Sequence, residues 1–295
     1  MKSKLSKIYN DKDKFDILNK PTYLFGYNPF YQVNKFIMDI DPKLNRNFVN
    51  NLEDLIINNS NVLDFRNDNY YDYRNNILTC GNSKADIYGL LHVASNDRNK
   101  KNTGIIFEDG IGYGLNAGLT DVFTNEINNK LFNYPLEALV ARALLVINNK
   151  LVTYSYFENN AACLLDLNSN IKELMKSIDN YYSVNFELMP LKSEYFAKKF
   201  NMFKGNMWEI EMDLLDERIY NLEKFNRENV YSIFQSLISI INNSMLNREE
   251  KQELFIDLHN IFRDLFTNDK LEYLNDFPSE FEKHIYVKKK KYEKD

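Results

Sequence analysis

The stretch from Asp86 to Thr124 contains two apolar segments joined by a polar loop, and it constrains the fold more than any other part of the chain. In the first segment, apolar residues recur at helical spacing around a single histidine, His92. The second segment restarts that spacing after a glycine-rich approach. The apolar faces comprise Ile87, Leu90, Leu91 and Ala94, then Leu115, Leu119, Val122 and Phe123, and the glycines are Gly110, Gly112 and Gly114. We therefore expect a pair of buried helices around which the rest of the chain is arranged.

These segments resemble the signature helices of the thermolysin-like (gluzincin) metallopeptidases. The match is closest to a group of small bacterial proteins that carry HELxHxAS followed by GLNEGLTE. Here the corresponding stretches read YGLLHVAS over residues 88–95 and GLNAGLTD over residues 114–121. In the family, the first helix supplies two histidine zinc ligands and a glutamate general base, and the second supplies a glutamate ligand. The resemblance covers residues 70–165.

Aligned in this way, the chain keeps the frame of the motif but loses its chemistry. Tyr88 occupies the place of the first histidine, Gly89 that of the general base and Ala117 that of the glutamate ligand. His92 is the only ligand position retained, while Asp121 keeps the acidic position that in the family orients the first histidine. A catalytic zinc site needs about three protein ligands and a water. The resemblance therefore implies no metal, no cofactor and no catalytic residue at this site.

The segment before the first helix predicts a β-hairpin. Tyr70–Tyr73 and Ile77–Cys80 read as short strands joined through Arg74-Asn75-Asn76. The resemblance implies that this hairpin forms one wall of the family's cleft, where a peptide would add to the edge strand. A groove for a peptide could then persist after the catalysis is lost.

Three interpretations of function follow. The first is a catalytically inactive metallopeptidase-like protein, a pseudoenzyme that binds a protein or peptide partner. The second is a hydrolase with a rebuilt, metal-free site in which Tyr88, His92, Asp121 and Ser95 carry out general acid–base chemistry, although no nucleophile is evident among them. The third is a structural helical protein unrelated to peptidases. Under the first interpretation, we expect the Tyr88 hydroxyl to donate a hydrogen bond to Asp121 and its ring to fill the space of the ion.

Composition excludes several other classes. The net charge of −5 does not indicate a nucleic-acid partner, and the lysine run at residues 288–291 reads as a solvated tail. No apolar run is long enough to predict a membrane-spanning helix, and the first residues lack the apolar core of a signal peptide. Cys80 and Cys163 are not in CxxC spacing and read as reduced core thiols. We therefore expect a cytoplasmic protein.

The predicted fold class is α+β and mostly helical, with a zincin-like core, a small sheet wall and a helical C-terminal region. The predicted regions are an irregular aromatic-rich arm (1–40), the zincin-like core (41–190), the helical region (191–287) and a basic tail (288–295). A helix is expected to begin at Asp41-Pro42, with Asp41 as its cap. The helices expected further along the chain are Leu136–Ile147, Leu164–Tyr182, Tyr195–Phe203, Trp208–Leu222, Val230–Asn242 and Arg248–Phe266.

Overall fold

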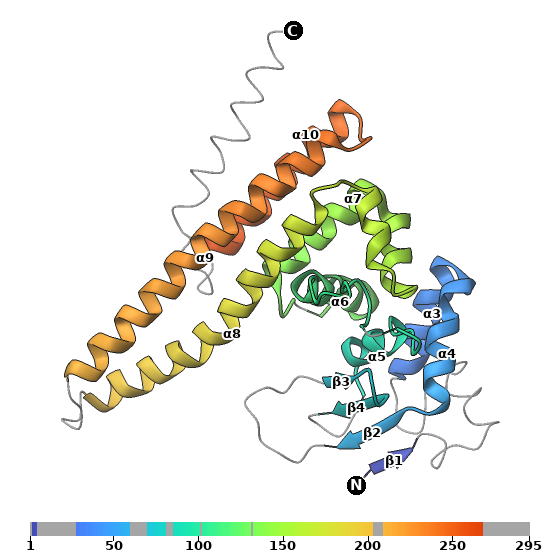
Figure 1. Ribbon diagram of the computed structural model, residues 1–295, viewed down its shortest axis with the longest axis horizontal. Coiled ribbons are helices and arrows are strands. Elements are labelled where there is room, and N and C mark those ends of the chain that lie inside the picture. The colour runs from blue at the N-terminus through green and yellow to red at the C-terminus, as the bar shows by residue number, and fades with distance from the viewer. Residues whose placement is uncertain are drawn as a thin grey trace. The chain divides into compact units, whose positions relative to one another are not determined.

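The computed structural model describes residues 2–4, 28–59, 70–80, 85–100, 102–130, 132–202 and 209–267 (Figure 1). The predicted basic tail and most of the predicted N-terminal arm lie outside the described residues. The chain forms two compact units, residues 1–167 and residues 168–295. The structure confirms a mostly helical chain with a small mixed sheet.

The sheet of the first unit contains β1 (Lys2–Lys4), β2 (Ile56–Asn59), β3 (Tyr70–Asp72) and β4 (Ile77–Cys80), in the order β1-β2-β4-β3. β2 runs parallel to β4, whereas β1 and β3 are antiparallel to their neighbours. The predicted hairpin is therefore confirmed as β3 and β4. Asp72 shapes its turn by accepting hydrogen bonds from the backbone N–H groups of Arg74 and Asn75.

Helices α3 (Pro29–Ile40) and α4 (Arg46–Glu53) flank a short 3₁₀ helix, η1 (Pro42–Asn45). The last part of the predicted irregular arm is thus helical. The reason is local, because the Asn28 side chain caps α3 and Pro29 starts it. The cap predicted at Asp41 is confirmed, with its carboxylate accepting from the Lys43 N–H, although the helix it starts is η1.

The two predicted central helices are α5 (Ile87–Ala94) and α6 (Tyr113–Asn128). α5 packs against α3, α4, α6 and β3, so it lies at the centre of the first unit. Its apolar face is fully covered: Leu90, Leu91 and Val93 are 0% exposed. Burial of a large aliphatic side chain stabilises a fold by roughly 1.5–3 kcal/mol, so this helix is a main contributor to the core.

Helix α7 (Pro135–Phe157) bends at Asn148, whose φ of −157° and ψ of 84° are not helical. The Asn148 side chain accepts a hydrogen bond from the Leu151 N–H and so caps the second half of the helix. This bend joins the predicted helix 136–147 to the segment that follows it. A second 3₁₀ helix, η2 (Ala161–Asp166), ends the unit.

The second unit contains α8 (Ile171–Met202), α9 (Glu209–Asn243) and α10 (Arg248–Thr267). α8 and α9 pack side by side in antiparallel directions (Figure 1). The break predicted between the helices Trp208–Leu222 and Val230–Asn242 is wrong, because α9 continues through the residues between them. Asn226 is fully buried, and its side-chain amide donates to Asn185 of α8. The predicted boundary between residues 190 and 191 falls within α8.

Candidate functional site at the degenerate motif

Helix α5 is held at both ends by side chains that satisfy its free backbone groups. Asp86 accepts from the Gly89 N–H at 2.8 Å and caps the first turn. At the other end, the Asn51 amide donates to the carbonyl oxygens of Val93 and Asn96, both at 2.7 Å. The motif helix is therefore fixed in position by a residue of α4.

A buried chain of amides and hydroxyls joins this helix to the hairpin. The Tyr71 hydroxyl of β3 donates to Asn76 at 2.8 Å and accepts from the Asn96 amide at 2.8 Å. Asn76 in turn donates to the Asn51 carbonyl oxygen at 2.8 Å. Because buried polar groups are costly without partners, these bonds fix the edge strand relative to the motif helix.

The side chains of Tyr88 and His92 lie next to each other on α5. Their ring centroids are 5.0 Å apart in an edge-on arrangement. Part of the His92 surface is accessible, yet desolvation lowers the pKa of its imidazole to about 4. His92 is therefore neutral near pH 7 and is not a general acid there.

Asp121 of α6 organises the turn before α7. Its carboxylate accepts from the Tyr134 N–H at 2.6 Å and from the Asn133 amide at 3.3 Å. Burial nevertheless raises the pKa of Asp121 to about 6. The Tyr88 ring lies 6.4 Å from the Tyr134 ring, so Tyr88 is beside the turn that Asp121 holds. The hydrogen bond from the Tyr88 hydroxyl to Asp121 stays a prediction.

The remaining positions of the second motif have packing roles. Ala117 is buried, and Asn116 accepts from the Ile105 N–H at 3.1 Å. Gly118 lies where α6 crosses α7: an added Cβ would come within 2.4 Å of the Glu137 backbone. The glycine at position 118 therefore allows α6 to approach the backbone of α7 closely.

Glu137 is a buried carboxyl that the sequence did not single out. It is 2% exposed in the first turn of α7. Burial, with a further contribution from the charge of Asp121, raises its pKa to about 8. A glutamate in the first turn of a helix usually reads as a favourable partner of the helix dipole, so the local sequence gives no signal of its burial.

Ser95, included in the metal-free hypothesis, belongs to a different network. Its hydroxyl is bonded to the His92 carbonyl oxygen at 3.3 Å and to the Thr103 hydroxyl at 3.2 Å. Tyr156 and Thr120, 2.8 Å apart, extend the same buried region. The Tyr156 hydroxyl is also hydrogen-bonded to Ser95, so the Ser95 hydroxyl belongs to this buried hydroxyl network.

Within the described ranges, no three His, Cys, Asp or Glu side chains gather in a metal-binding arrangement. A surface hollow of about 520 Å³ is lined by part of α7, by Lys100 and by Cys163, and none of the motif residues line it. Every helix in the described part of the chain is too short or too polar to span a bilayer. Searches against protein-family models, curated proteins and solved structures found no match to this chain.

Proposed function

We propose that this chain is a catalytically inactive metallopeptidase-like protein that binds an extended segment of a protein partner beside β3. The proposal rests first on the motif itself. Tyr88 and Ala117 cannot act as the histidine and glutamate ligands they replace, and Gly89 has no side chain to accept a proton from water. The first histidine ligand, the general base and the glutamate ligand of a zinc peptidase are therefore all replaced in these places.

The observation that carries the binding role is the position of β3. Among the strands that the structure describes, it is the last in the sheet order, and α5 packs against it. An edge strand presents unpaired backbone N–H and C=O groups to which an extended chain can add. The hairpin that leads through β4 toward the motif helix also matches the arrangement implied by the gluzincin resemblance, and it supports a zincin-like core.

Aromatic side chains and an arginine accompany this edge. The Arg74 guanidinium donates to the Tyr73 hydroxyl at 3.3 Å. This hydrogen bond, with smaller electrostatic contributions from Tyr73, Asp72 and, least of all, Tyr113, raises the pKa of Arg74. Tyr113 is 49% exposed at the start of α6. Tyrosine and arginine are enriched at the energetic centres of protein interfaces, so this surface suits a peptide better than a small polar substrate.

The test uses the purified full chain and a library of short, unstructured peptides. A peptide that binds should slow hydrogen exchange at the amides of β3, should remain uncleaved by mass spectrometry and should bind equally with a zinc chelator present. Tyr113→Ala should weaken binding by about 5- to 30-fold. The matched control is Tyr220→Ala, which removes a tyrosine that is 66% exposed in the other unit.

Protection confined to other elements, or unchanged affinity in Tyr113→Ala, would contradict the proposal. Cleavage of the bound peptide that is lost in His92→Ala would instead favour the metal-free hydrolase built on Tyr88, His92 and Asp121.

A further inference from the structure

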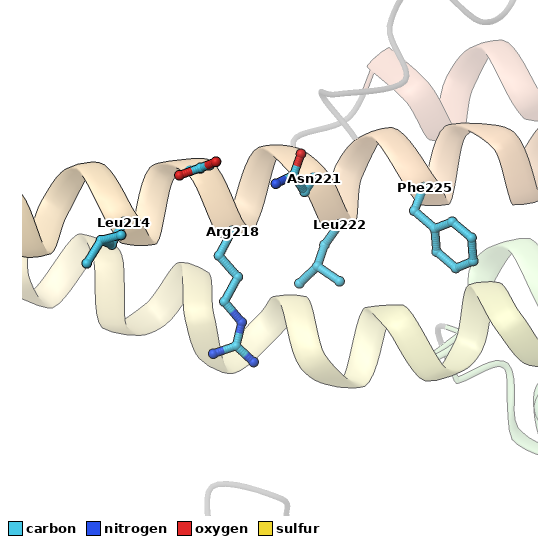
Figure 2. A pocket seen from close by; sticks show the side chains of 6 residues that line it. Leu214, Arg218, Asn221, Leu222 and Phe225 are labelled. Carbon is cyan, nitrogen blue, oxygen red and sulfur yellow. The ribbon is translucent and has the colours of Figure 1, made fainter.

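One face of α9 in the second unit exposes large apolar side chains. Leu214 is 64% exposed and Phe225 is 46% exposed. Figure 2 shows Leu214, Arg218, Leu222 and Phe225 on the same side of the helix. They border a hollow of about 350 Å³ whose described lining residues all come from α9, and these are Leu214, Glu217, Arg218, Asn221, Leu222 and Phe225.

Apolar and polar residues follow one another in a similar order along this face whether the helix is read from Leu214 or from Phe225. Apolar residues stand at the two ends, Leu214 at one and Phe225 at the other, and the residues between them are polar except for Leu222. At 100° per residue, Leu214, Arg218, Asn221 and Phe225 fall in one narrow stripe. When α9 of a second copy packs against this face in the antiparallel direction, Leu214 of each copy contacts Phe225 of the other. Such self-complementarity is the property of a two-fold interface.

The charges flanking the stripe agree with this arrangement. Glu217 and Lys224 are both exposed and lie on the same flank of α9. Being two turns apart, they are separated by roughly 10 Å along the axis, which is too far for direct pairing within the helix. In an antiparallel pair, Glu217 faces the partner's Lys224, and the contact occurs twice. Arg218 is already bound to Glu187 of α8 in its own chain, which leaves Glu217 for the partner.

We propose that this face of α9 seats α9 of a second copy of the chain in an antiparallel, two-fold dimer. Leu214 and Phe225 supply its apolar contacts and Asn221 lies near the axis, where a polar residue in an apolar seam fixes the register. The Glu217–Lys224 pairs fix the direction of the helices, because a parallel pair would not bring them together.

The oligomeric state of the full chain, measured by sedimentation across a range of concentrations, tests this proposal. The wild type should dimerise. Glu217→Lys and Lys224→Glu should each weaken the dimer about tenfold, because each places like charges together twice. The double variant with both reversals should restore the wild-type affinity. Asp216→Lys, a charge reversal at an exposed residue about 200° around α9 from Leu214, is the matched control and should leave the dimer intact.

A chain that stays monomeric at all concentrations would overturn the proposal. So would a dimer that is indifferent to both single reversals, or single reversals that weaken it without recovery in the double variant. Leu214→Ser should also weaken the dimer. The charge reversals keep the test sound if Leu214→Ser fails to fold, since Glu217 and Lys224 are solvent-exposed.

Discussion

Glu137 and Asp121 place two carboxyl groups within electrostatic reach of each other in the interior of the first unit. Like charges in a desolvated region disfavour double ionisation. Asp121 has hydrogen-bond donors in Tyr134 and Asn133 that favour its charged form. Glu137 is therefore the member of the pair that keeps its proton near neutral pH.

This assignment predicts how stability depends on pH. The folded pKa of Glu137, about 8, lies above the ordinary glutamate value of 4.5. The folded state therefore binds more protons than the unfolded state in this window, and the free energy of unfolding falls as pH rises from about 4.5 to about 8. Glu137→Gln should remove the contribution of this carboxyl to the decrease and should raise the free energy of unfolding near pH 8 by about 1–3 kcal/mol. Urea titrations of both proteins across this pH range would measure the difference.

Asp121 supplies the internal control. Its pKa is also raised, to about 6 from 3.8, so Glu137→Gln should retain a decline below about pH 6. A variant less stable than wild type at the alkaline end would mean that the Glu137 carboxylate is stabilised in the fold and that our assignment of its proton is mistaken.

At the scale of elements, the crossing of α6 over α7 depends on the absence of a side chain at Gly118. An added Cβ would lie 2.4 Å from the Glu137 backbone carbon. Gly118→Ala should therefore destabilise the protein by about 3 kcal/mol or more, despite the better helix propensity of alanine. Thermal or chemical unfolding measures this.

Gly110→Ala is the matched comparison. Gly110 has a φ of +85°, but the nearest atom to an added Cβ is 4.0 Å away. It should cost only about 1–2 kcal/mol from backbone strain. Equal losses at the two glycines would argue against the close crossing.

Whether the motif residues of α5 and α6 lie opposite each other can be tested by introducing the zinc ligands that the gluzincin resemblance implies. Tyr88→His, Gly89→Glu and Ala117→Glu, introduced together, should create a zinc site with His92. We expect the triple variant to bind zinc at about one ion per chain by elemental analysis, with little binding by the wild type. Adding His92→Ala to the triple variant is the control and should abolish the binding. A folded triple variant with no zinc affinity would show that these residues do not converge.

At the scale of the whole molecule, the helices and strands of residues 1–167 form one compact unit. The sheet, α5, α6 and α7 all belong to it, and the hydrogen-bonded link from Asn51 through Asn76 to Tyr71 is internal to it. We therefore expect a fragment of residues 1–167 to fold alone and to unfold cooperatively by circular dichroism. A fragment that lacks a cooperative transition would mean that the first unit depends on residues 168–295.

The amino-acid sequence by itself determined the local elements and the residues that stand at the motif positions. The hairpin, α5, α6 and the Asp41 cap follow from alternation, helical spacing and a capping residue, all of which act over a few residues. The residues Tyr88, Gly89 and Ala117 are read from the chain alone, and glycine and alanine have no side-chain atom that could bind a metal or accept a proton in any fold.

Only the tertiary structure decided which polar residues are buried and what they bind. Asn226 looked like part of a loop, yet it is a helical residue paired with Asn185. Glu137 looked like a solvent-exposed first-turn glutamate, and Asp121 bonds to Tyr134 and Asn133. In each case the decisive partner or covering group comes from another element, so the energy of burying the polar group depends on long-range packing that periodicity does not encode.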